Sequence, residues 1–255
     1  VSFDLPSYTS DIDALGTLRI LESIKTLNLK KTKFYQASSS EMYGDVKNRY
    51  QNEETKFSPL SPYACAKVYS YYITKYYRDA FNIYASNGIL FNHESERRGE
   101  TFVTKKIATS VAKIHLGIEK KLLIGNLNSK RDWGYAPEYV QGIWKMMQQK
   151  KPDDYVLATG KSYTVKKFIE LAFSVVGKKI IWKGSGLNEA GYDHISGKRI
   201  VEVRKKYFRP LEVNYLKGNY SKAKKHFGWK PTTTLNDLAK IMVQDQINLL
   251  KNEKN

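Results

Sequence analysis

Apolar residues recur along the chain at spacings that predict alternating helices and strands. Between residues 11 and 27 they fall every three or four positions, as on one helix face: Ile12, Leu15, Leu18, Leu21, Ile24 and Leu27. A short apolar and aromatic run, residues 34–38, then ends in small polar residues, which is typical of a buried strand emerging into a loop. A helical stretch over 61–81 and a strand over 83–91 follow. This alternation predicts an α/β fold with a parallel sheet.

The same reasoning extends to the rest of the chain. It predicts helices over 101–117, 137–149, 164–176, 220–227 and 235–250, with Thr101 and Thr164 as N-caps. Strands are predicted over 122–125, 155–158 and 179–182. Residues 45–60 lack periodicity and are predicted to form a loop over the site. Residues 184–198 are rich in Gly and polar residues, which favours a flexible surface loop.

Composition excludes several classes of protein. Hydrophobic residues make up 41% of the 255 residues, as in a globular protein. No apolar run approaches the roughly 20 residues of a membrane helix, and no signal peptide is visible, so we expect no membrane partner and a cytoplasmic location. The single cysteine, Cys65, excludes an internal disulfide. The net charge of +18 raises nucleic-acid binding as an alternative, but the lysines are dispersed and no zinc-finger or RNA-binding pattern is present.

The candidate chemistry lies between residues 38 and 67. Ser61 is a predicted N-cap and Pro62 suits the first position of the following helix. Tyr63 and Lys67 are then i and i+4 on one helix face. A phenol with the ordinary pKa of about 10 is a poor base at neutral pH. A neighbouring ammonium favours the phenolate, so this pair is a candidate general base.

Two upstream groups extend this site. Ser39 can hydrogen-bond a substrate hydroxyl, and Glu41 adds a second group able to take a proton, which indicates that a second proton is moved. The Tyr-x-x-x-Lys spacing alone is uninformative because it recurs at Tyr43, Tyr71, Tyr163 and Tyr220, where a solvated helix face is the simpler interpretation. Tyr63 differs because its helix begins where a strand end is expected, and ligands bind there in parallel sheets.

These residues resemble the GDP-mannose 4,6-dehydratase family of the extended short-chain dehydrogenase/reductase superfamily. Two further blocks are similar to the family pattern, Asn87–Ser95 and Arg97–Lys105. The remaining matching stretches are Asp13–Arg19, Phe34–Glu41, Ser61–Lys67, Arg131–Gly134 and Tyr207–Pro210. The resemblance covers nearly the whole chain.

The resemblance implies a doubly wound Rossmann-type sheet with a smaller α/β substrate-binding domain. Residues 1–94 would be the C-terminal part of the cofactor domain. Residues 95–255 would mainly bind the GDP-sugar, with some segments returning to the cofactor domain. No Gly-rich dinucleotide turn is found, so we expect an N-terminally truncated copy that lacks about three βα units. The helix over 61–81 and the one before it form a dimer interface in the superfamily, which implies a homo-oligomer, a dimer or tetramer.

The resemblance also assigns roles to individual residues. The implied catalytic set is Ser39, Glu41, Tyr63 and Lys67. Lys67, His93 and Arg98 would bind NADP, the implied cofactor. The implied contacts to GDP-mannose are Asn92, Val103, Lys105, Arg131, Arg209 and Glu212. Blander interpretations stay open, namely a polar loop over 92–98 and a surface salt bridge at Arg209 and Glu212. Asp193 and His194 resemble metal ligands, but nothing completes a set, so no metal is expected.

The implied activity is conversion of GDP-mannose to GDP-4-keto-6-deoxy-mannose by an internal NADP redox cycle. The alternatives are another sugar-nucleotide epimerase or reductase of the same superfamily, or a non-catalytic fragment that binds GDP-sugar or assembles with a full-length subunit. Glu41 separates the dehydratase from a simple C4 epimerase, because epimerisation at C4 needs no base for the C5 proton.

Overall fold

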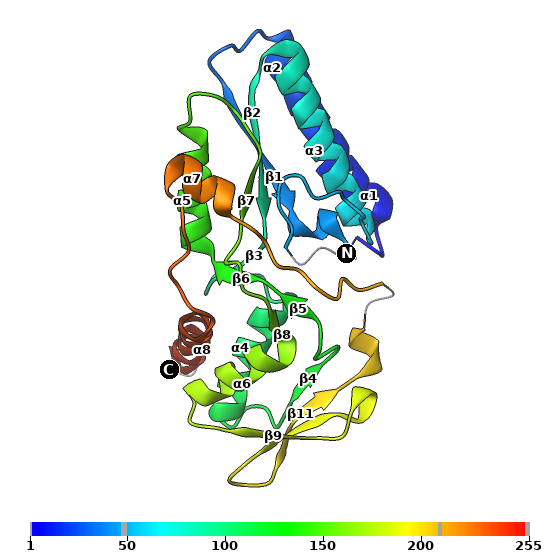
Figure 1. Ribbon diagram of the computed structural model, residues 1–255. Helices are drawn as coiled ribbons and strands as arrows, with labels where there is room; N and C mark the ends of the chain where they lie inside the picture. Colours follow the sequence, from blue (N-terminus) through cyan, green and yellow to red (C-terminus); the bar gives the residue numbers. More distant parts are fainter. Residues whose placement is uncertain (1, 47–49, 209–210, 253–255) are drawn as a thin grey trace.

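The computed structural model describes residues 2–46, 50–208 and 211–252, and it has two parts stacked end to end (Figure 1). The upper part contains a three-stranded sheet between two helical layers, and the lower part contains a four-stranded sheet with helices beside it. The chain crosses between the two parts several times, since β7 and α7 return to the upper sheet from the second half of the sequence.

The upper sheet is parallel and has the order β1-β2-β7. The predicted strands 34–38, 83–91 and 155–158 are therefore confirmed, with shifts of at most one residue at their ends. One helical layer consists of α1, the π-helical turn η1, α2 and α3, and the other of α5 and α7. The bounds are β1 (Lys33–Ser39), β2 (Tyr84–Leu90), β7 (Tyr155–Leu157), α1 (Pro6–Ser10), η1 (Asp11–Leu15), α2 (Gly16–Thr26), α3 (Pro62–Phe81), α5 (Ala136–Met147) and α7 (Ser221–Phe227).

The lower part packs three helices against a mixed sheet of order β4-β11-β10-β9. Its largest hydrophobic cluster joins α4, α6 and α8 with the strands β4 and β11. Short strand pairs, β3 with β6 and β5 with β8, lie where the two parts meet (Figure 1). The bounds are β3 (Asn92–Glu94), β4 (Leu122–Ile124), β5 (Lys130–Arg131), β6 (Trp133–Tyr135), β8 (Tyr163–Thr164), β9 (Ile180–Lys183), β10 (Ala190–Asp193), β11 (Arg199–Val203), α4 (Val103–His115), α6 (Val165–Val175), α8 (Leu235–Asn252), η2 (Ser40–Tyr43), η3 (Gly186–Asn188) and η4 (Lys205–Tyr207).

Two predictions for the lower part are wrong. Residues 184–198 are not simply a flexible loop, because β10 within them pairs with β9 and with β11. Thr101 does not cap α4, which begins at Val103 after an extended Phe102 and has no side-chain cap. The ring of Phe102 lies 3.5 Å from the guanidinium carbon of Arg98, four residues earlier in the same loop.

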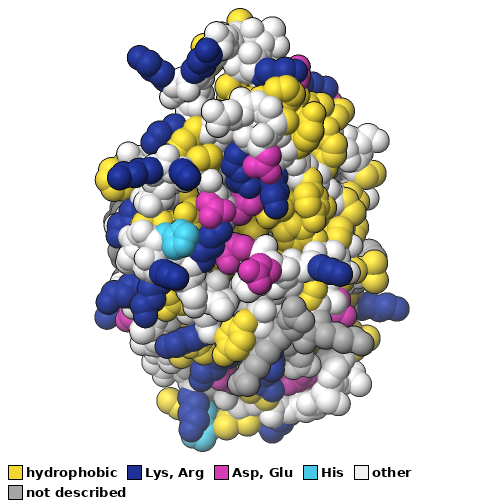
Figure 2. Space-filling view, turned by 45° about the horizontal axis from the view of Figure 1, so that its top comes forward, with side chains coloured by type: hydrophobic (Ala, Val, Ile, Leu, Met, Phe, Trp, Pro, Cys, Tyr) yellow, Lys and Arg dark blue, Asp and Glu magenta, His cyan; other side chains and the backbone are white. Residues whose placement is uncertain are grey.

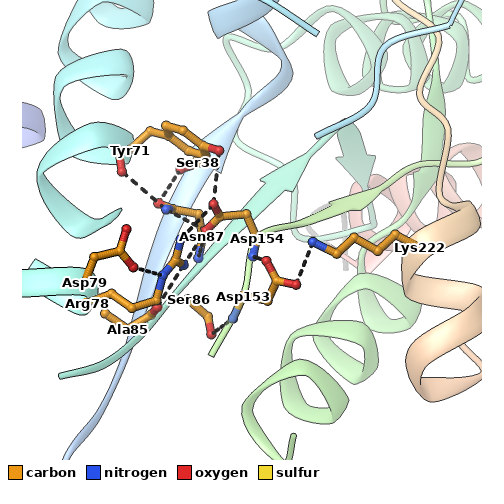
Figure 3. A network of polar contacts seen from close by, with 10 residues as sticks. All are labelled: Ser38, Tyr71, Arg78, Asp79, Ala85, Ser86, Asn87, Asp153, Asp154 and Lys222. Atoms are coloured by element: carbon orange, nitrogen blue, oxygen red, sulfur yellow. Dashed lines mark hydrogen bonds and ion pairs between the residues drawn. The ribbon is translucent and has the colours of Figure 1, made fainter. Parts of the chain in front are cut away.

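A buried polar network ties the layers of the upper part together (Figure 3). Asp154 is 5% exposed, and Arg78 of α3 donates to both its oxygens at 2.7 and 3.1 Å. The hydroxyl of Tyr71 donates to Asp154 at 3.0 Å, and the side-chain amide of Asn87 donates at 2.9 Å. The network therefore joins α3, β2 and the residue before β7. Tyr71, one of the uninformative Tyr-x-x-x-Lys matches, lies in the core.

The N-cap of α3 is confirmed and positions the predicted base. The Ser61 hydroxyl accepts the backbone N–H of Ala64 at 3.1 Å. We expect Ser61→Ala to lower the free energy of unfolding by about 1 kcal/mol, because one N–H of the first turn loses its acceptor. Urea denaturation measures the change, and Ser23→Ala on an exposed helix face serves as a control of similar size. An unchanged midpoint for Ser61→Ala would contradict a stabilising cap.

The surface carries the excess positive charge without concentrating it. Lys and Arg side chains are scattered over the face shown in Figure 2, with acidic side chains between them. Hydrophobic side chains gather toward the upper right, on the side of α1 to α3 in Figure 1. Among the described residues, no helix is long and apolar enough to cross a membrane.

Candidate functional site

The carboxyl end of β1 carries the first two predicted catalytic side chains. Ser39 is the last residue of β1, and its hydroxyl accepts the backbone N–H of Glu41 at 3.2 Å. Glu41 therefore lies in the first turn of η2, directly after the strand. Both side chains are half-buried. Gly44 then turns with φ of 59°, where a Cβ would collide with the carbonyl of Ser58, so only glycine suits this close return of the chain.

Tyr63 and Lys67 lie in the first turns of α3, which packs against η2. Both are half-buried, so they are accessible from outside the core. The Lys67 ammonium lies 5.5 Å from the centre of the Tyr63 ring and 2.9 Å from the Asp13 carboxylate. The structure thus brings the ammonium beside the phenol, as predicted, and adds a carboxylate partner that the prediction did not contain. Asp13 is 54 positions away in the sequence, so no local spacing could have indicated the pair.

The next strand end contributes Asn92 and His93 of β3. The His93 ring lies 5.3 Å from Tyr139 in a stacked arrangement, and its Nδ1–H donates to the Phe91 carbonyl at 2.9 Å. Burial lowers the pKa of His93, and the nearby Arg98 lowers it further, so the neutral ring is favoured. The side-chain oxygen of Asn92 is buried without a hydrogen-bond partner among the described residues. Such an atom is available to a bound ligand.

Arg98 is held between a carboxylate and an aromatic ring. Its Nε lies 3.0 Å from Glu94 Oε2, and its guanidinium carbon lies 3.5 Å from the centre of the Phe102 ring. The Nε–H is buried and does not point at an acceptor with hydrogen-bond geometry, so the contact with Glu94 is an ion pair. Residues 92–98 therefore contain a buried carboxylate that faces a half-buried guanidinium.

Four of the predicted nucleotide-sugar contacts lie in the lower part. Lys105 is buried, its ammonium donates to the Glu96 carbonyl at 2.7 Å, and Val103 packs against the large hydrophobic cluster. Arg131 is also buried and donates to the Val213 carbonyl at 2.6 Å. Its other guanidinium nitrogen lies 3.6 Å from Glu212. Arg131 and Glu212 are thus brought together, whereas Arg209 lies outside the described residues.

Asp132 is a buried carboxylate that the sequence analysis did not single out. It accepts the backbone N–H groups of Thr159, Gly160 and Gly218 and the Thr159 hydroxyl, at 2.6 to 3.2 Å. Burial raises the pKa of Asp132 to about 6, although each of these donors favours the ionised form. Asp132 joins the end of β5 to two distant loops and so fixes the backbone beside Arg131.

The predicted groups do not all meet at one point, but they occupy one region. The strands of the upper sheet end toward the lower part, where β3 and β6 lie (Figure 1). Within the loop over residues 45–60, the backbone N–H of Ser58 donates to the Met42 carbonyl of η2 at 3.1 Å, and the backbone of Gln51 bonds with that of Lys217 and Asn219. The predicted place of this loop over the site stays a prediction. Within the described ranges, no cluster of His, Cys, Asp and Glu could hold a metal ion.

Comparison with known proteins gives consistent matches. The family profile described as GDP-mannose 4,6 dehydratase matches residues 1–242. The chain is 50% identical over 252 residues to the GDP-mannose 4,6 dehydratase of Drosophila melanogaster, covering 98% of this chain and 64% of that protein. It is 52% identical over 252 residues to the enzyme of the same name from Sinorhizobium fredii, covering 98% and 72% respectively. The chain therefore spans about two thirds of the length of these relatives.

The fold has close counterparts among solved structures. RMD from Pseudomonas aeruginosa, solved in complex with NADPH, superimposes with a TM-score of 0.80 at 18% sequence identity. The match covers 97% of this chain and 77% of that one. This likeness confirms the predicted α/β fold class.

Proposed function

The chain belongs to the GDP-mannose 4,6-dehydratase family, and from this premise we propose that it carries the catalytic and sugar-nucleotide-binding groups of such a dehydratase. The reaction is the conversion of GDP-mannose to GDP-4-keto-6-deoxy-mannose with loss of water. The observation that supports the proposal best is the placement of Ser39, Glu41, Tyr63 and Lys67 around the carboxyl end of one parallel strand, half-buried and accessible. Ligands bind at this end of parallel sheets.

The proposed cofactor is NADP, and residues at the end of β3 suit it. Among the residues that the structure describes, the buried side-chain oxygen of Asn92 has no hydrogen-bond partner, and Arg98 offers a cation stacked on an aromatic ring. Lys67, His93 and Arg98 would hold the cofactor, with Asn92 on the sugar side. The planar guanidinium of Arg can donate two parallel hydrogen bonds to phosphate oxygens. When bound, the cofactor would supply a group that accepts one hydride and later donates it back.

Two side chains, Tyr63 and Glu41, would take protons, and Ser39 and Lys67 would assist Tyr63. Ser39 would hold the sugar 4-hydroxyl, and Tyr63 would take its proton as the alcohol is oxidised. Lys67 would favour the phenolate, while Asp13 keeps the Lys67 ammonium in place at 2.9 Å. The resulting 4-ketone acidifies the C5 proton. Glu41 would remove that proton and pass it to the C6 hydroxyl, which would leave as water with formation of a C5–C6 double bond. Return of the stored hydride to C6 and of a proton to C5, which balances the proton taken by Tyr63, would give the 6-deoxy product.

The lower part would bind the GDP group. Val103 and Lys105 at the start of α4 would contact the guanine base, Arg131 and Arg209 the diphosphate, and Glu212 the ribose hydroxyls. A guanidinium for phosphate and a carboxylate for a diol is sound chemistry. In this proposal residues 1–94 belong mainly to the cofactor side and residues 95–255 mainly to the sugar-nucleotide side.

The proposed assembly is a homo-oligomer, a dimer or a tetramer. The outer helices of the upper part expose large apolar side chains that a second copy could cover. These residues are Tyr8, Ile12, Leu15, Ile20, Tyr69, Tyr72 and Tyr76. Exposed apolar areas of this kind mark interaction sites when they are contiguous.

Calorimetry with GDP tests the nucleotide part of the proposal. We expect the chain to bind GDP, and we expect Arg131→Ala to weaken this binding about tenfold or more, because a charged partner of the diphosphate is lost. Arg204→Ala, which removes an exposed Arg on the same part of the molecule, is expected to have little effect. If GDP did not bind, or if both variants weakened it equally, the assigned nucleotide site would be wrong. NADP⁺ titrated separately is expected to bind less well than GDP.

A further inference from the structure

Glu94 is an almost fully buried carboxylate near the proposed site, and the mechanism above does not use it. It ends the short strand β3 and is 1% exposed. Burial raises its pKa, while Arg98 and the Thr104 hydroxyl favour its ionised form. Burying a carboxylate is costly unless its partners compensate. The contacts of Glu94 with Arg98 and Thr104 are therefore the guide to its role.

One carboxylate oxygen of Glu94 contacts residues of two different segments. Oε2 lies 3.0 Å from Arg98 Nε and also accepts a hydrogen bond from the Thr104 hydroxyl. Arg98 belongs to the loop that follows β3, and Thr104 belongs to the first turn of α4. The two residues on either side of Thr104 are Val103 and Lys105, the proposed guanine contacts. A single buried atom thus joins the proposed cofactor side to the proposed GDP side.

We propose that Glu94 is a positioning residue that sets the first turn of α4 for GDP through Thr104 and sets the Arg98 guanidinium through the ion pair. The identity of the ligand, GDP, rests on the proposed function, whereas the contacts of Glu94 are present in the structure itself. Because α4 has no side-chain N-cap, the Thr104 hydrogen bond is the polar contact that ties its first turn to β3. Arg98, stacked on Phe102, is held from its other side by the charge of Glu94.

Two substitutions separate the two roles. Glu94→Gln retains an acceptor for the Thr104 hydroxyl but removes the charge that faces Arg98. Glu94→Ala removes both. Glu94→Gln is therefore expected to leave GDP affinity within about threefold of the wild-type chain, while Glu94→Ala and Thr104→Val each weaken it about tenfold. The double variant Glu94→Ala with Thr104→Val should be no weaker than either single variant, because they remove the same contact.

The experiment measures GDP binding by calorimetry and unfolding by urea on the same variants. Binding is measured where each variant is fully folded, so a loss of stability alone does not lower the affinity. Glu94→Gln and Arg98→Met should each lower the free energy of unfolding measured in urea. In the double variant the two losses should not add up, since both substitutions break the same ion pair. Glu100→Ala, an exposed carboxylate of the same loop, is the matched control and should change neither quantity.

The outcomes distinguish the two proposals. If the Glu94 and Arg98 substitutions are additive in urea, the ion pair has no positioning role and the proposal is overturned, whether or not GDP binds. If Glu94→Gln weakens GDP as much as Glu94→Ala, or if Thr104→Val leaves GDP binding unchanged, the positioning of α4 is overturned while GDP binding itself stands. If the wild-type chain does not bind GDP, the proposed function fails, and the GDP role of Glu94 fails with it. Non-additivity in urea would then support the ion pair alone.

Discussion

Glu41→Gln is expected to lower the turnover of GDP-mannose by about 10²–10⁴-fold, which is the usual contribution of a positioned acid–base group. Glutamine has nearly the same shape but cannot take the C5 proton. The local fold should persist, because the contact between residues 39 and 41 uses the backbone N–H of residue 41 and not its side chain. Formation of the 4-keto product from GDP-mannose with NADP⁺ measures the change against the wild-type rate.

A partial reaction sharpens this prediction. Under the proposed function, oxidation of the sugar 4-hydroxyl would need Tyr63 and not Glu41, so Glu41→Gln should still generate NADPH in a single turnover, whereas Tyr63→Phe should not. Glu54→Gln changes an exposed carboxylate and is the matched control, with an activity near that of the wild type. Undiminished dehydration by Glu41→Gln would refute the role of this residue and would favour an epimerase or reductase.

Asp154→Ala is expected to have the largest effect on stability, about 3–5 kcal/mol in the free energy of unfolding. The substitution leaves the Arg78 guanidinium buried without its carboxylate, and it removes the acceptor of Tyr71 and Asn87 (Figure 3). Urea denaturation measures the loss. Asp79→Ala is the matched control, because Asp79 faces the same Arg78 at 3.5 Å but is mostly exposed, so a change below about 0.5 kcal/mol is expected. Equal effects of the two substitutions would contradict the account of the network.

The same carboxylate predicts a dependence on pH. Burial opposes the ionisation of Asp154, but the Arg78 hydrogen bonds outweigh it, with help from Asn87 and Tyr71, so the folded-state pKa lies below the ordinary value. The stabilisation is therefore complete above the unfolded-state pKa of about 3.9 and is lost as the pH falls through the lower folded-state value. Asp154→Asn should show a shallower loss of stability in this acid range than the wild type. Identical acid profiles would show that the network does not favour the ionised form.

Much of the upper part could be predicted because its signals are local. The strand over 34–38, the helix over 61–81 and the cap at Ser61 follow from residues that interact within a turn or two of one another. The i and i+4 relation of Tyr63 and Lys67 is of the same kind. The family resemblance rested on short motifs, and the comparisons confirm the family.

One of the wrong predictions lies where distant segments meet. β10 has the composition of a loop but becomes a strand because β9 and β11 supply its hydrogen bonds. The N-cap of α4 is Phe102, one residue after the predicted Thr101, and the Phe102 ring stacks on Arg98 four positions earlier. The pairing of β10 is not encoded in the spacing of neighbouring residues.

The amino-acid order was sufficient to predict the fold class and the family and to propose the site residues, since each of these rests on contacts between near neighbours or on recurring motifs. The partners of those residues were decided only by folding. Asp13 reaches Lys67 across 54 positions, and the Asp154 network joins three separate segments. Charges buried together must be matched in three dimensions, and their separation along the chain carries no information about that match.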